Sequence, residues 1–184
     1  MTYKATGIII RKKDIREADR LFTIYTREYG KIEAMAQGVR KLSSKLSGNL
    51  ELLNHAVFTI AKGKQLDRIA TVDIKHSFET AKGNLDRLTV ALAAMELIDV
   101  VVRPQSADHA LFETISDLLE TLDVSDEISH TSLLRLFTIK VAIILGYRPN
   151  IKSAEAILQT VESQSLNDMG NISANDPLVM RIFR

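Results

Sequence analysis

Two clusters of basic side chains are the most informative chemical feature of this 184-residue sequence. Arg and Lys carry positive charge and several N–H donors, which suits them to bind phosphate oxygens. Both clusters fall in connections between predicted strands, where side chains reach solvent at little packing cost. The sequence therefore predicts a phosphate-binding surface that consists of Arg11, Lys12, Lys13, Arg16 and Arg20 in one cluster and Arg40, Lys41 and Lys45 in the other.

The competing interpretation of these clusters is that they only keep the protein soluble. The net charge of the whole chain is +1, but it is unevenly distributed. Residues 1–75 hold 15 Lys and Arg against 8 Asp and Glu, whereas residues 76–184 hold 9 against 15. Such asymmetry favours a polyanion-binding half joined to a half with another role.

Two tyrosines near the first cluster offer a further contact with a nucleic acid. Tyr25 and Thr23 alternate with Phe22 and Ile24 along one predicted strand, and Tyr29 follows that strand. Bases stack on exposed aromatic rings with little dependence on sequence, so Tyr25 and Tyr29 are candidate stacking platforms. Packing inside the protein is the alternative for each ring.

A search for catalytic chemistry finds no established motif. The sequence has no phosphate-binding loop, no dinucleotide fingerprint, no HExxH and no GxSxG. It has no Cys, and no His has a partner at metal-ligand spacing. Asp14 and Glu17 alternate with Arg16 and Arg20, which indicates surface ion pairs and not a general acid and base. We therefore expect no enzyme, no cofactor, no metal and no small-molecule substrate.

The basic clusters belong to a segment with the pattern of short strands. Runs rich in β-branched and aromatic residues alternate with Gly and polar clusters and predict strands at 4–13, 20–26, 31–37, 56–62 and 66–74. Five strands within about 75 residues favour a small barrel. An OB-fold is the leading prediction, and an SH3-like barrel fits the same pattern.

The hydrophobic period becomes helical from Asn84 onward. Helices are predicted from Asn84 to Pro104, at 107–122 and at 131–145, with weaker patterns at 153–161 and 177–183. Asn84 is a suitable N-cap, and Gly146 and Pro149 end the third helix. The predicted fold is α+β with two domains: an N-terminal five-stranded barrel at 1–80 and an all-α helical bundle at 81–184.

No segment of the sequence is suited to cross a membrane. The most apolar stretch, 90–102, contains Glu96 and Asp99 and is shorter than the roughly 20 residues that a spanning helix needs. The apolar residues 7–10 are too few for a secretory signal. We expect a cytoplasmic protein without a membrane partner.

Several segments together resemble one known family. Residues 7–31, GIIIRKKDIREADRLFTIYTREYGK, resemble the opening of RecO, a family of bacterial recombination mediators and DNA repair proteins. Residues 36–45 are similar to the Gly-x-Arg segment of that family, and 96–99 and 145–150 resemble its helical landmarks. The resemblance runs in order over about residues 1–152.

The resemblance implies an N-terminal OB-fold that binds single- and double-stranded DNA, and a helical domain after it. Proteins of this family anneal complementary strands. With the partner RecR they help to load RecA onto strands covered by single-stranded-DNA-binding protein. The resemblance implies no turnover chemistry and a location in the bacterial cytoplasm, at the nucleoid.

Departures from the family pattern lie near the C-terminus. Many relatives carry a zinc-binding Cys cluster after the segment that matches 145–150, whereas this chain has no Cys, so we expect a reduced, zinc-free region there. The family binds the acidic, apolar tail of single-stranded-DNA-binding protein. Candidate anchors for this tail, for which ordinary salt bridges are the alternative, are Arg135, Lys140, Arg148 and Lys152. The alternative function is a protein-interaction adaptor whose barrel docks proteins and makes little DNA contact.

Overall fold

The computed structural model describes residues 1–41, 44, 46–125 and 130–147. The chain forms two compact units. The first contains Met1–Phe78 and Met95–Phe112, and the second contains Glu79–Ala94 and the described residues from Glu113 to Tyr147. The division into domains 1–80 and 81–184 stays a prediction, because compact packing units do not by themselves define domain boundaries.

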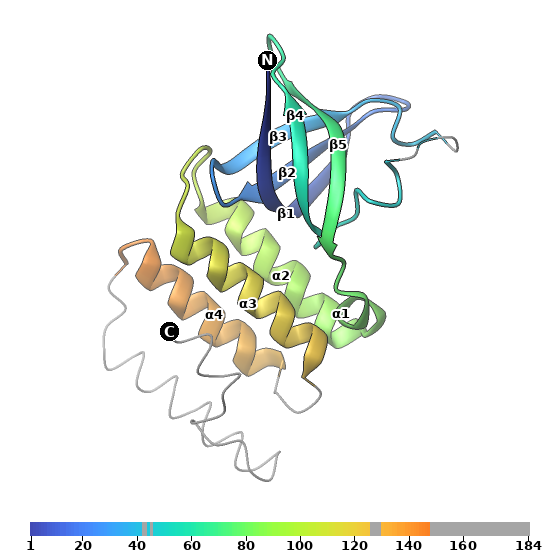
Figure 1. Cartoon of the computed structure of the whole chain (residues 1–184). Coiled ribbons are helices and arrows are strands. Elements are labelled where there is room, and N and C mark those ends of the chain that lie inside the picture. Colours follow the sequence, from blue (N-terminus) through green and yellow to red (C-terminus); the bar gives the residue numbers. More distant parts are fainter. Residues whose placement is uncertain (42–43, 45, 126–129, 148–184) are drawn as a thin grey trace. The chain divides into compact units, whose positions relative to one another are not determined.

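Five strands of the first unit close a barrel in the order β1-β2-β3-β5-β4 (Figure 1). The long strand β1 pairs with β4 through its first half and with β2 through its second half, and its register shifts between Ile9 and Arg11. A short parallel pairing of β3 with β5 completes the circle. This topology is that of an OB-fold and confirms the predicted fold class. The strands are β1 (Thr2–Asp14), β2 (Arg20–Thr26), β3 (Gly30–Ala36), β4 (His55–Ala61) and β5 (Asp67–His76).

The inward-facing side chains of the strands fill the barrel. Alternate residues such as Phe22 and Ile24 on β2 are fully buried, as period-two alternation requires. Burying each such side chain contributes about 1.5–3 kcal/mol. The segment between β3 and β4 is fastened to β1, because Leu53 N donates to Ile9 O at 2.9 Å and Ile9 N donates to Asn54 O at 3.1 Å.

Helix termini follow the capping residues of the sequence. The Oδ1 atom of Asn84 accepts hydrogen bonds from Asp86 N at 3.0 Å and Arg87 N at 3.2 Å, which confirms Asn84 as an N-cap. Gly146 adopts φ +83° after the last turn and confirms the predicted C-terminal stop. The helices are α1 (Glu79–Gly83), α2 (Leu85–Val101), α3 (His109–Val124) and α4 (His130–Ile144). The predicted helices at 153–161 and 177–183 lie outside the described residues.

Polar contacts join the helical segments within the second unit. The buried Arg87 of α2 donates from Nη1 to Leu122 O of α3 at 3.2 Å, and Ala81 N of α1 donates to Asp123 Oδ1 at 2.9 Å. Figure 1 shows the helices drawn beside one another. Over the described ranges, no helix combines the length and the apolar character that crossing a membrane requires.

Candidate nucleic-acid interface

Main-chain hydrogen bonds bring the two predicted basic clusters to one end of the barrel. The β1–β2 connection is a tight turn in which Ile15 N donates to Asp19 O at 3.2 Å. The carboxylate of Asp19 accepts a hydrogen bond from Gly38 N at 2.8 Å, and Arg40 N donates to Ala18 O at 3.2 Å. The first turn after β3 is therefore fixed against the β1–β2 connection.

Asp14 pairs with one arginine from each cluster. Arg20 Nε lies 2.6 Å from Asp14 Oδ1, and Arg40 Nη1 lies 3.5 Å from Asp14 Oδ2. The hydrogen bond from Arg20 is the largest cause that lowers the pKa of Asp14 below its usual value, and the charges of Arg40 and Lys12 add to it. Asp14 is thus a surface ion-pair partner, as the sequence indicated.

The other predicted cations of these loops differ in whether a carboxylate pairs with them. Arg16 Nη1 lies 3.7 Å from Asp19 Oδ2, and Lys12 Nζ lies 2.5 Å from Glu51 Oε2. Lys13 and Lys41 are exposed, and among the described residues neither forms an ion pair. Lys45 lies outside the described residues. Most of the described cations of the two clusters therefore pair with carboxylates.

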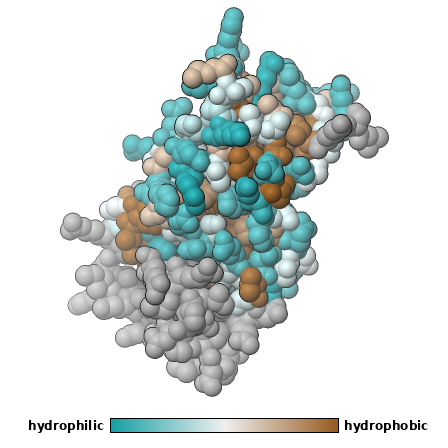
Figure 2. Space-filling view, in the orientation of Figure 1, coloured by the Kyte–Doolittle hydropathy of each residue, from teal (hydrophilic) through white to brown (hydrophobic). Residues whose placement is uncertain are grey.

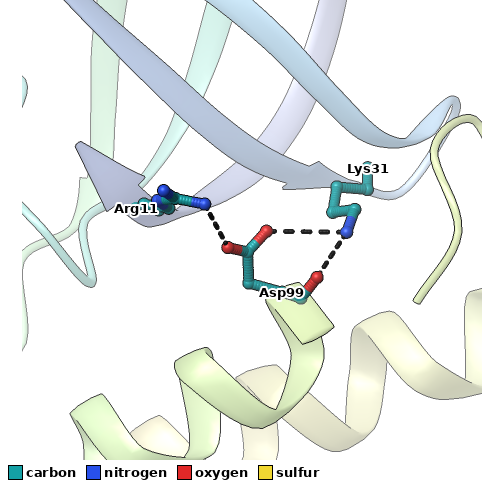
Figure 3. Close-up of polar contacts among 3 residues, drawn as sticks. All are labelled: Arg11, Lys31 and Asp99. Atoms are coloured by element: carbon teal, nitrogen blue, oxygen red, sulfur yellow. Dashed lines mark hydrogen bonds and ion pairs between the residues drawn. The ribbon is translucent and has the colours of Figure 1, made fainter. Parts of the chain in front are cut away.

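Arg11 has a different partner from the rest of its cluster. Its Nη1 atom lies 3.0 Å from Oδ2 of Asp99, on the C-terminal part of α2 (Figure 3). Lys31 of β3 donates from Nζ to the main-chain oxygen of Asp99 at 2.5 Å and lies 3.5 Å from Oδ1. The Lys31 side chain is 12% exposed, whereas that of Arg11 is 55% exposed. Lys31 therefore holds Asp99 in place, and Arg11 is the more replaceable partner.

Sequence analysis missed the pairing of Lys31 with Asp99. Its one signal was an acidic residue inside the apolar stretch 90–102. A carboxylate there needs a cation when the helix packs, because a buried charge without a partner is costly. The sequence does not indicate which cation that is.

The two candidate stacking tyrosines occupy opposite environments. Tyr25 is fully buried, its ring stacks on Phe112 at a centroid distance of 6.4 Å, and its hydroxyl donates to Asp108 O at 3.4 Å. Burial raises the pKa of Tyr25 to about 12. A base cannot stack on a ring with no exposed surface. Tyr25 therefore packs inside the protein, which is the alternative that the sequence left open for it. Tyr29 is 42% exposed and lies with its ring 4.9 Å from that of Tyr3.

A further group of cations lies on the β4–β5 hairpin. Lys62 and Lys64 are exposed, and Lys62 Nζ lies 6.0 Å from the ring centroid of Tyr3. Arg68 Nη1 contacts Gln37 Oε1 at 3.4 Å and so reaches the turn after β3. Lys62 and Lys64 are not among the phosphate-binding residues that the sequence predicted. Their position at the connection between two predicted strands was the signal in the sequence that their side chains reach solvent.

The face of the molecule drawn in Figure 2 is mostly polar. Figure 2 shows hydrophilic residues spread over the face that it presents, with hydrophobic residues in separate patches between them. Within the described part of the chain, no three His, Asp or Glu side chains gather closely enough to hold a metal ion. The chemical property of this arrangement is a set of cations whose carboxylate partners can be replaced by other anions.

The two described candidate anchors for a partner tail, Arg135 and Lys140, do not share one helix face. Arg135 is exposed on α4, and Lys140 on the same helix is half-buried. Burial lowers the pKa of Lys140, and the charge of Asp117 opposes this effect. Five positions along a helix correspond to a rotation of about 140°, so the two residues do not share a face. Arg148 and Lys152 lie outside the described residues.

Comparison with known proteins identifies a family over most of the chain. Residues 1–78 match the model of the recombination protein O N-terminal region, and residues 82–166 match that of its C-terminal region. A DNA repair protein RecO from Pelotomaculum thermopropionicum is 33% identical over 147 residues, which are 80% of this chain and 56% of that protein. Proteins of the same name are 33% identical in Desulfitobacterium hafniense, over 89% of this chain and 59% of theirs, and 36% identical in Dehalococcoides mccartyi, over 82% and 58%.

The chain thus spans less than two thirds of the length of these relatives. The N-terminal family model covers the five strands of the barrel, and the C-terminal model covers helices α2, α3 and α4. The chain belongs to the RecO family.

Proposed function

We propose that this protein is a DNA repair and recombination mediator that binds single- and double-stranded DNA through its barrel and anneals complementary strands. The observation that carries the proposal is the fastening of two basic loops at one end of the barrel, through Asp19 with Gly38 and Ala18 with Arg40. Membership of a family whose members are named DNA repair proteins supports it.

The ion pairs of this surface suit a reversible polyanion site. An exposed ion pair contributes about 0–1 kcal/mol, so a phosphate can replace a carboxylate at small cost. Annealing requires neutralisation of phosphates on two strands while the pairing edges of the bases stay uncovered. Basic loops, with the exposed Tyr29 as a stacking platform, meet this requirement.

Partner proteins are part of the same proposal. We assign RecR and single-stranded-DNA-binding protein as partners, with RecA loading as the outcome, in the bacterial cytoplasm at the nucleoid. The excess of acidic residues in positions 76–184 leaves the phosphate-binding role to the barrel. No step of this function needs a catalytic group, so we propose no enzymatic activity.

The adaptor function is the second candidate. It is favoured by one observation, namely that most described cations of the loops already have carboxylate partners. The salt dependence of binding to single-stranded DNA separates the two functions. Neutralising four to six phosphates gives a slope of log affinity against log salt of roughly −3 to −4, whereas an adaptor gives a slope near zero.

Strand annealing tests the assignment of the loop after β3. The full chain is compared with the variant Arg40→Glu/Lys41→Glu/Lys45→Glu, which should lose most of its annealing. A matched control, Lys4→Glu/Lys75→Glu/Arg103→Glu, makes the same change in charge at exposed positions outside the loops. Circular dichroism verifies folding. Equal annealing by the wild type and the loop variant would refute the assignment, as would equal losses in the loop variant and the control.

A further inference from the structure

One carboxylate, that of Asp14, stands between cations of both basic loops. We propose that Asp14 limits the affinity of the barrel for DNA, because it neutralises Arg20 and Arg40 until a phosphate displaces it. This inference rests on the proposed function and names the residue that sets its strength. Nothing in the sequence pattern distinguished Asp14 from the neighbouring acidic residues.

The geometry occupies both oxygens of the carboxylate. Oδ1 accepts from Arg20 Nε at 2.6 Å, and Oδ2 faces Arg40 Nη1 at 3.5 Å. The Asp14 side chain is 44% exposed and that of Arg40 is 42% exposed, so solvent and ligands reach the group. A pair of arginines that would present two positive charges to a phosphate therefore presents a net charge of one.

Other carboxylates near the cations have different roles. Asp19 is 15% exposed and also accepts from Gly38 N, which makes it a structural part of the turn. Asp99 is 19% exposed and is held by Lys31. Among the residues that the structure describes, Glu51 forms its ion pair with Lys12. In the described part of the chain, Asp14 is the carboxylate that pairs with two of the predicted phosphate-binding cations.

The size of the effect follows from counterion release. Each phosphate neutralised on single-stranded DNA changes log affinity by about −0.7 per unit of log salt. With 1 M salt as the reference at which the additional charge gives no gain, one additional effective charge should raise affinity about 8-fold at 50 mM salt and about 3-fold at 200 mM salt. A gain that shrinks with salt is the signature of an unmasked cation.

The test measures binding of a fluorescent oligothymidylate to full-length variants by anisotropy at both salt concentrations. Asp14→Asn should bind more tightly than the wild type by these factors, with a slope steeper by about 0.7. Asp14→Glu retains the charge and should resemble the wild type. Asp73→Asn is the matched control, because Asp73 is an exposed barrel residue for which the described chain provides no ion pair.

Each outcome decides the inference. Equal affinities of Asp14→Asn and Asp73→Asn would overturn the inference. If the wild type still binds the oligonucleotide in that case, the proposed function stands. Weaker binding by Asp14→Asn would mean that Asp14 positions the arginines for DNA, which also contradicts masking. Absence of wild-type binding at 50 mM salt would instead refute the proposed function itself, and the inference with it.

Discussion

Asp14 and Asp99 each hold two cations, yet the two clusters differ in burial. The Asp14 side chain is 44% exposed and pairs with Arg20 at the start of β2 and Arg40 in a turn, whereas Asp99 is 19% exposed and its Lys31 is 12% exposed. Lys31 also donates to the main chain of α2, so it caps the helix as well as pairing with the carboxylate. The same kind of ion pair can thus exchange partners at the exposed Asp14 site, whereas at the half-buried Asp99 site it holds α2 against the barrel.

Apolar and main-chain contacts near Asp99 also hold residues 95–112 against the barrel. Residues 95–112 belong to the same compact unit as the barrel. Gln105 N donates to Lys31 O at 2.9 Å, and a Cβ on Gly30, which has φ +66°, would lie 2.3 Å from the main chain of Ser106. Phe112 is fully buried against Tyr25 and His55. Loss of groups here should reduce stability, and loss of groups at Asp14 should alter binding.

The largest effect is expected from Phe112→Ala. The ring contacts Tyr25, His55 and Arg27, and its removal leaves a cavity beside buried groups. We expect the free energy of unfolding to fall by about 3–5 kcal/mol, as measured by urea denaturation of the full chain. Phe112→Leu, which keeps most of the volume, should lose less. A loss below about 1 kcal/mol for the alanine variant would contradict the attachment role.

Tyr25 should make the attached region sensitive to alkali. Its folded-state pKa of about 12 exceeds the ordinary value of 10.0, because burial disfavours the phenolate. Burial of the neutral Tyr25 side chain therefore makes its full contribution to the free energy of unfolding below pH 10. This contribution falls by about 2–3 kcal/mol as the pH rises toward 12. Tyr25→Phe should unfold less readily than the wild type over that range. Tyr3, whose pKa is also raised, is unchanged in both proteins. If the free energies of unfolding of the two proteins changed in parallel as the pH rises from 10 to 12, Tyr25 would not be the source of the sensitivity to alkali.

Removal of the half-buried carboxylate of Asp99 should come next in size. Asp99→Ala leaves the mostly buried Lys31 ammonium with only the main-chain acceptor. We expect a loss of about 1–3 kcal/mol in the free energy of unfolding. Lys31→Met, which removes the charge and keeps most of the side-chain volume, should partly restore stability in the double variant. No recovery would indicate that the charge of Lys31 is not what makes Asp99 necessary.

The smallest change in stability is expected at the exposed site. Asp14→Ala removes two ion pairs, but both are solvent-exposed, so the free energy of unfolding should fall less than it does in Asp99→Ala. Urea denaturation beside Asp99→Ala makes the comparison direct. If Asp14→Ala were the more destabilising of the two, the distinction between exchange and attachment would be wrong.

Local patterns predicted the fold, and non-local contacts decided the roles of the site residues. The strands were recognised to within two or three residues because alternation and β-branched content are local signals. The pairing of Arg11 with Asp99 joins positions 88 residues apart, and Phe112 buries a tyrosine of the same barrel from a similar separation. Only packing reveals which carboxylate a cation meets. The five-residue helix α1 was missed because it is too short to show a period.

The parallel seam of the barrel has a dynamic consequence. Strands β3 and β5 pair only through Ala34 with Asp67 and Met35 with Arg68, whereas β1 and β2 pair from Gly7 with Thr26 to Asp14 with Arg20. Backbone amides at this seam should exchange with deuterium sooner than those of the β1–β2 ladder, since local opening begins where few bonds must break. Arg68 and Gln37 meet across the seam, so a strand of DNA lying there would close it and slow that exchange.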